Sequence, residues 1–262
     1  MRRTAKFPWP TQTPAPHCQT GATSARHSGL VGYNVQGAVD TETHIIVTHD
    51  VINQGFDREQ LSPMALATKA AIGRDTLHAL ADKGYFSGTE ITACDKAGIT
   101  VTMPRPETSG NRGKGMYVKA DFRYAPGRDV YICPTGEELT YRYTREEDGF
   151  RVARYWTNEC QHCPVKSRCT TGNERRITRW EYEHLVDEMR DRLRSDADPM
   201  TLRRSTAEHP FGTIKAWMGA THFLTRRLPN VRTEMALNVL AYNLKRMVAL
   251  VGIKGLMAAI PT

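Results

Sequence analysis

Residues 76–104, TLHALADKGYFSGTEITACDKAGITVTMP, contain the pattern that decides the fold class. TLHALAD predicts a buried strand, SGTEITACDKAG a short helix beginning after Ser87 and ending before Gly98, and ITVTMP a second strand. This order favours an α/β sheet with parallel neighbouring strands. Ligands of such sheets are bound at the carboxyl ends of strands, and Asp82 lies at such an end. Asp82 is therefore either a ligand-binding carboxylate or an acid that caps the next turn.

The flanking residues extend this pattern on both sides. VGYNVQGAVD and THIIVTHDVIN alternate apolar and polar residues around a Thr-Glu-Thr turn, which predicts a hairpin. DREQLSPMALATKAAIG has helical spacing, with Pro63 in its first turns and Gly73 at its end. Towards the C-terminus, three segments predict helices: TRWEYEHLVDEMRDRLRS, PMTLRRSTAEHPFGTIKAWMG and NVRTEMALNVLAYNLKRMVALVG. An apolar stripe in the last one is predicted to be core: Leu237, Leu240, Leu244 and Val248.

Composition divides the chain into four regions. Residues 1–28, rich in Pro, Thr and Ser, predict a disordered or irregular lead. Residues 29–104 predict the first part of an α/β core, and residues 178–262 its helical completion. Residues 105–177 predict an insertion made of a basic loop and short strands, among them DVYICP, ELTYRYT and FRVARYWT. The expected fold is therefore a mixed α/β sheet with flanking helices, interrupted by a β-rich insertion.

The charge of the chain narrows the class of partner. Its 262 residues carry a formal net charge of +8, with a pI near 9.3, as expected for a chain with a polyanionic partner such as nucleic acid; a solvated basic surface would give the same charge. The sequence shows no apolar run of the ~20 residues needed to cross a bilayer and no secretory signal, so we expect a cytoplasmic protein without a membrane partner.

Residues 105–128, RPETSGNRGKGMYVKADFRYAPGR, are basic and rich in glycine, with interleaved tyrosines. Such a segment can lie along a phosphate backbone, although a plain flexible connection has the same composition. We expect Arg112 and Lys114 in this loop, and Lys83 beside Asp82, to contact DNA.

Four cysteines gather in and beside the insertion: Cys133, Cys160, Cys163 and Cys169. A CxxC turn followed by a third cysteine, with a fourth one hairpin upstream, could close a tetrahedral structural Zn²⁺ site. His162 is an alternative ligand, whereas Cys18 and Cys94 lie apart from the group. The other interpretation is a set of reduced cysteines that pack as small apolar side chains.

Arg204, Glu208 and Lys215 are spaced by four and seven positions. A continuous helix would place all three on one face, and Pro210 predicts that the helix kinks or begins near Glu208. The pattern fits a surface ladder of ion pairs, or a metal-ligating carboxylate flanked by cations that bind phosphate.

Five segments together resemble one family, in this order: GYNVQGAVD, ADKGYFSG, CQHCPVKSRC, AEHPFGTIK and YNLKRM. From about Gly29 to the end, the chain looks like the DDE-type transposases of bacterial insertion sequences. The resemblance implies a ribonuclease H-like fold and a trio of two Asp and one Glu that holds Mg²⁺ or Mn²⁺. It also implies that the partners are DNA, as element ends and target, and a second copy in a homodimer.

The resemblance assigns roles to particular residues. Asp82 matches the family's second aspartate, and Glu208 matches the glutamate of its signature, with Arg204 and Lys215 at the matching spacings. Thr201 stands where the family has tyrosine. Asp82 and Glu208 are thus expected to ligate metal, with Gly84 letting the chain turn away from Asp82. Two such ions would activate water or a 3′-hydroxyl and stabilise the leaving oxygen.

The family's first aspartate has no counterpart in this chain. It should precede the GYNVQ strand, but residues 1–39 contain no acid, and Asp40 and Asp50 come later. The chain therefore looks like a transposase truncated or frame-disrupted near its N-terminus, and inactive unless Asp40 substitutes. A zinc-containing DNA-binding fragment without catalysis, and a nuclease that cuts without joining strands, are the alternatives. A structural or protein-interaction role has the least support.

Overall fold

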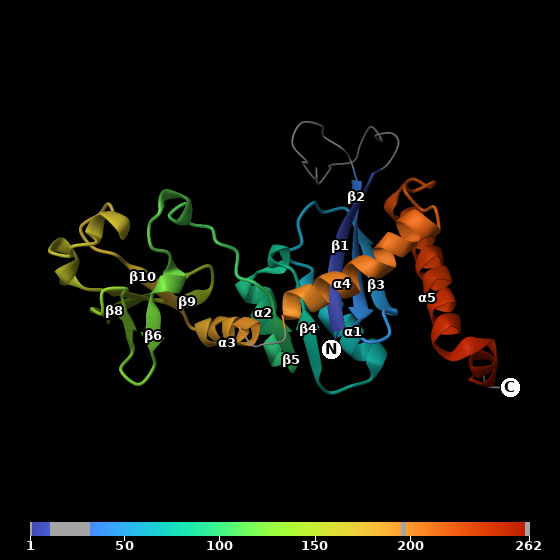
Figure 1. Cartoon of the computed structure of the whole chain (residues 1–262), viewed down its shortest axis with the longest axis horizontal. Coiled ribbons are helices and arrows are strands. Elements are labelled where there is room, and N and C mark those ends of the chain that lie inside the picture. Colours follow the sequence, from blue (N-terminus) through green and yellow to red (C-terminus); the bar gives the residue numbers. More distant parts are fainter. Residues whose placement is uncertain (1, 11–31, 195–197, 260–262) are drawn as a thin grey trace. The chain divides into compact units, whose positions relative to one another are not determined.

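The computed structural model describes residues 2–10, 32–194 and 198–259. Residues 1–105 and 188–262 form one compact unit, and residues 106–187 form a second (Figure 1). The second unit begins one residue later and ends ten residues later than the predicted range 105–177.

The first unit contains a five-stranded mixed sheet in the order β3-β2-β1-β4-β5. Pairs β1/β2 and β2/β3 are antiparallel, whereas β1/β4 and β4/β5 are parallel. Its strands are β1 (Arg2–Pro10), β2 (Gly32–Asp40), β3 (Ile46–Ile52), β4 (Leu77–Leu80) and β5 (Ile99–Thr102). The predicted hairpin and the parallel strand–helix–strand unit are both confirmed.

Strand β1 corrects the prediction for the start of the chain. Residues 2–10, predicted as irregular, form the central strand, which pairs with β2 along its whole length and with β4 at Arg2 and Arg3. The prolines at 8 and 10 disfavour a strand by themselves, but they lie where β1 pairs with β2 alone, so that each has an unpaired side. Residues 11–28 of the predicted lead lie outside the described residues.

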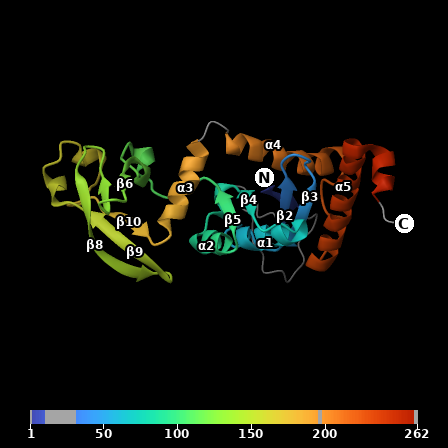
Figure 2. The ribbon, with the colours of Figure 1, turned by 90° about the horizontal axis from the view of Figure 1, so that it is seen from below.

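Helices cover both faces of this sheet (Figure 2). Helices α1 (Leu61–Ile72) and α2 (Gly88–Lys96) lie on one face and α4 (Pro199–Gly212) on the other. Gly73 ends α1 in a left-handed conformation, as predicted. The remaining helical segments of the unit are η1 (Lys83–Tyr85), the π-helical turn η6 (Thr213–Trp217) and α5 (Leu228–Ala258); α3 spans Glu183–Arg194.

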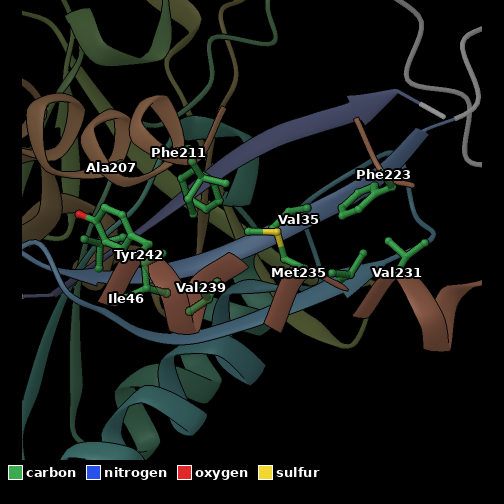
Figure 3. Packing of buried hydrophobic residues seen from close by; sticks show 12 residues of the cluster. Val35, Ile46, Ala207, Phe211, Phe223, Val231, Met235, Val239 and Tyr242 are labelled. Atoms are coloured by element: carbon green, nitrogen blue, oxygen red, sulfur yellow. The ribbon is translucent and has the colours of Figure 1, made fainter. Parts of the chain in front are cut away.

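The core between the sheet and α4, η6 and α5 is apolar (Figure 3). Val35 and Val39 of β2 pack there with Phe211 and Met235, and all four side chains are fully buried. Gly37 lies between the two valines, and a Cβ at this position would be 2.8 Å from Cζ of Phe211. The glycine of the GYNVQG segment is therefore required by the close approach of the phenylalanine of the HPFG segment.

Helix α5 has two apolar faces, and the stripe predicted as core is not the buried one. Its buried residues are Val231, Met235, Val239 and Tyr242. Leu237, Leu240 and Leu244 are instead 62%, 63% and 51% exposed, and Val248 is only partly buried. Helical spacing identifies both stripes but cannot decide which one meets the sheet.

By length and composition alone, α5 could also cross a membrane, since an 18-residue window has a mean hydropathy of 1.2. The sequence analysis expected no segment able to cross a bilayer, and α5 qualifies that expectation. A single helix of this kind is weak support for a membrane span. One face of α5 packs on the sheet of the first unit, and only 11% of the apolar window is buried.

The second unit contains an antiparallel sheet in the order β10-β9-β8-β7-β6. Its strands are β6 (Arg123–Ala125), β7 (Val130–Ile132), β8 (Glu138–Glu147), β9 (Phe150–Trp156) and β10 (Ile177–Trp180). Its 3₁₀ turns are η2 (Arg112–Lys114), η3 (Lys119–Asp121), η4 (Asn158–Gln161) and η5 (Lys166–Arg168). Residues 178–180, predicted as helix, are strand because β10 pairs with β9 and completes the sheet.

Candidate functional site

Asp82 follows the carboxyl end of β4, as the sequence predicts. Its Oδ1 accepts a hydrogen bond from the backbone N–H of Lys83 at 2.7 Å and caps η1. The other carboxylate oxygen lies 3.8 Å from Nη2 of Arg203 on α4, and the Asp82 side chain is 50% exposed. The structure thus confirms that Asp82 is a capping acid, and it leaves the carboxylate partly exposed to solvent.

The structural reason for a glycine at position 84 differs from the predicted one. It lies inside η1 rather than in a left-handed turn, and a Cβ there would be 3.3 Å from Oδ2 of Asp57. The position is restricted by close approach of a carboxylate, and not by the direction of the chain.

A buried polar network, which the sequence did not reveal, fixes η1 beside β2. Oδ1 of the buried Asp57 accepts hydrogen bonds from Nδ2 of Asn34 at 2.9 Å and Nε2 of Gln36 at 3.0 Å. The hydroxyl of Tyr85 donates to Oε1 of Gln36. The sequence does hold one indication of this network: Asn34 and Gln36 lie two residues apart in the GYNVQ strand and so on one face of it. A buried amide on that face requires a polar partner.

Helix α4 brings Arg203 to Asp82. Glu208 is exposed and comes five residues after Arg203, which corresponds to about 7.5 Å along the helix and about 140° around it. The sequence pattern did not predict a role for Arg203. Its guanidinium neutralises part of the charge at the end of β4.

The face expected to join Arg204, Glu208 and Lys215 is interrupted. Helix α4 begins at Pro199, capped by Asp198, and includes Pro210 without ending there, so the predicted start near Glu208 is wrong. After Gly212 the chain enters the π-turn η6, which changes the angular spacing before Lys215. Lys215 is half-buried, and this burial lowers its pKa.

The two later aspartates, Asp40 and Asp50, make contacts of their own in the fold. Asp40 accepts hydrogen bonds from the backbone N–H and hydroxyl of Thr43 in the hairpin turn, and Asp50 pairs with Arg232 at 3.0 Å. Within the described ranges, no group of three or more His, Cys, Asp or Glu side chains is arranged to hold a metal ion.

The four cysteines of the second unit do line one pocket: Cys133, Cys160, Cys163 and Cys169. Burial raises the pKa of the Cys169 thiol, and the other three sulfurs raise it further. Cys133 and Cys169 also belong to the core with Phe122 and Tyr131. His162 does not line this pocket. Cys94 is buried apart from the group, with its pKa raised to about 12, and Cys18 lies outside the described residues.

Several basic side chains predicted to contact DNA are accessible. Lys83, Arg112, Lys114 and Arg204 are all exposed. The nearest carboxylate oxygen to Arg112 is that of Glu107 at 4.0 Å, a weak surface pair.

Comparison with known proteins identifies the family that the chain resembles. Residues 132–248 match the family described as transposase DDE domain; this range contains the cysteines and Glu208 but not Asp82. A search of curated proteins found no match. A similar solved structure is the piggyBac transposase synaptic complex with hairpin DNA, with 8% identity and a TM-score of 0.45. The similarity covers 97% of this chain and 48% of that one, so the chain spans about half of its length.

Proposed function

We propose that this chain, a relative of the DDE-type transposases, binds DNA but holds an incomplete set of catalytic carboxylates. The first unit is taken as ribonuclease H-like, which its mixed sheet with helices on both faces supports. Asp82 and Glu208 are the second and third members of the trio. Bound Mg²⁺ or Mn²⁺ would activate the attacking oxygen, but the residues that the structure describes include no group of three or more ligands that fits such an ion.

The observation that carries this proposal is the composition of β1. This strand is the parallel neighbour of β4, so an acid on it would lie beside Asp82. Arg3 pairs with Leu80, and continuing this register places position 5 level with Asp82. That position is alanine, and no residue of β1 is acidic. Two metal ions need several carboxylate ligands, and a strand without an acid cannot supply one.

Binding to DNA is supported by charge. The chain carries a net charge of +8, and its exposed cations include Arg112 and Lys114 in the insertion and Lys83 beside Asp82. Cations spaced along a surface bind phosphates without reading bases, so we expect affinity that falls steeply with salt.

The test compares binding with cleavage on supercoiled DNA and on linear DNA bearing an element end, with Mg²⁺ or Mn²⁺. The natural chain should bind both and nick neither. Ala5→Asp should produce metal-dependent nicking, because the strand register places position 5 level with Asp82. Thr4→Asp is the matched control, since successive positions of a strand alternate between the two faces of a sheet.

Adding Asp82→Ala to Ala5→Asp should abolish the nicking that Ala5→Asp produces. If the natural chain nicks DNA and loses this activity with Asp82→Ala, a complete carboxylate set exists and the proposal is wrong. Absence of binding to either DNA contradicts the proposal at its first step.

A structural Zn²⁺ in the second unit is the proposal for the cysteines. The four thiols line one pocket and are of the right chemical type, and their mutual effect on the pKa of Cys169 supports their proximity. Their arrangement does not amount to a metal site. Metal analysis of the purified chain should give one zinc per chain, lost with Cys163→Ser; zinc-free folded protein contradicts it.

The homodimer implied by the family has a suitable surface on α5. Leu237, Leu240, Leu244, Met247 and Val251 are exposed and follow alternating spacings of three and four, the pattern of a two-helix seam. No charged residue shares this seam before the helix is interrupted at Gly252, so two copies meet without like-charge repulsion. We therefore take a second copy of this chain as the occupant.

Sedimentation should show a dimer that Leu240→Lys dissociates. Leu66→Lys, at a comparably exposed leucine on α1, should leave it intact. A monomeric natural chain, or one that binds lipid vesicles through this face, contradicts the proposal.

A further inference from the structure

A pocket between η6 and α5 has no role in the function described so far. It opens to solvent and is lined by side chains from the end of α4, from η6 and from α5: His209, Thr213, Trp217, Tyr242, Lys245 and Arg246. All of these belong to the first unit. Asp82 does not line it, and Glu208 does not line it either.

The charge of the pocket favours an anion. Lys245 is exposed and makes no hydrogen bond or ion pair with the part of the chain that the structure describes. Arg246 uses its Nε to donate to the backbone oxygen of Thr43 at 2.7 Å, which holds its guanidinium at the pocket. No acidic side chain lines the pocket, so two positive charges face the opening.

The rim of the pocket presents an aromatic plane. Trp217 is 83% exposed, although it lies in a helical turn whose neighbour Ile214 is fully buried. Within the described ranges, no ring or cation contacts its indole. An exposed indole beside two cations is the combination that binds a base and its phosphate, because bases stack on aromatic faces while cations hold the backbone.

The inner wall of the pocket is fixed and polar. The Tyr242 hydroxyl donates to the backbone oxygen of His44 at 2.8 Å, so Nδ1 of His209, 3.1 Å away, must donate to the tyrosine oxygen. Burial and the nearby Arg246 lower the pKa of His209, which keeps its ring neutral. Nε2 of His209 is then an acceptor, which suits the amino group of a base or a sugar hydroxyl.

We propose that this pocket receives one nucleotide of single-stranded DNA, with its base on Trp217 and its phosphate on Lys245 and Arg246. The inference rests on the proposed DNA binding and adds to it a preference for unpaired ends. A base inside a duplex is stacked on both sides and cannot reach the indole, whereas a base in an overhang can.

The experiment compares two labelled DNAs by fluorescence anisotropy, a blunt duplex and the same duplex with a thymidine overhang. The natural chain should bind the overhang about tenfold more tightly, the magnitude expected for one stacked base. Trp217→Ala and Lys245→Ala should each remove this preference while leaving blunt-duplex affinity nearly unchanged. Lys254→Ala is the matched control, because Lys254 is an exposed lysine of α5 outside the pocket and should keep the preference.

The possible failures are distinguishable. Absence of binding to both DNAs contradicts the proposed function itself. Binding of both DNAs with equal affinity, or an overhang preference that survives Trp217→Ala and Lys245→Ala, overturns the pocket assignment alone. Competition by free thymidine monophosphate as effective as that by the overhang strand overturns it as well, since the pocket would then serve a free nucleotide.

Discussion

Replacing Gly37 with alanine tests the packing that joins two of the most distant motifs of the chain. The added Cβ would lie 2.8 Å from Cζ and 3.2 Å from Cε2 of Phe211, whereas carbon atoms in contact are about 3.5–4.0 Å apart. Phe211 is 0% exposed and surrounded by the core of β2, β3 and α5, so its ring has little room to move. Overpacking of this kind costs about 1–3 kcal/mol.

Part of this cost is offset in the unfolded chain. Alanine has fewer accessible backbone conformations than glycine, which contributes about 0.4–1 kcal/mol in favour of the folded state. We therefore expect Gly37→Ala to lower the free energy of unfolding by about 1–2 kcal/mol, measured by urea denaturation with an unchanged slope.

Two further variants make the test specific. Gly212→Ala is the matched control, since its Cβ would meet nothing within 4 Å and its backbone is helical, and it should be neutral or stabilising. Phe211→Leu removes the ring edge, so the double variant should lose less than the sum of the two single losses. An unaffected Gly37→Ala, or strictly additive losses, would refute the proposed contact.

Acidification should destabilise the chain through His44 and His209, whose pKa values are lowered from 6.5 chiefly by burial, with His209 and Arg246 adding to the effect at His44. Because the unfolded chain binds these protons more tightly, the free energy of unfolding should fall between about pH 7 and about pH 5, and His209→Gln should flatten this profile in thermal melts. Tyr85→Phe should cost about 1–2 kcal/mol, because it removes the hydroxyl that donates to the buried Gln36; an unchanged urea midpoint would contradict this.

Individual residues show which features of the fold could be predicted from the sequence. Gly73, the Thr-Glu-Thr turn and the position of Asp82 could be predicted because they depend on neighbours within a few residues. The strand at residues 2–10 could not, because its pairing partners come some thirty and seventy positions later. The pairing of Asp82 with Arg203 depends on how α4 crosses the sheet, which helical periodicity does not specify.

The sequence by itself determined most of the elements after residue 29, the basic charge and the absence of an acid before the GYNVQ strand, because these follow from composition and short-range spacing. Only the tertiary structure showed which contacts require these residue types in the motifs. Gln36 holds Asp57 and accepts from Tyr85, Gly37 makes room for Phe211, and the Asn243 side chain pairs with both backbone groups of Ile46. Each of these is a contact between segments far apart in the chain, and a contact of this kind exists only after the sheet and its helices have packed.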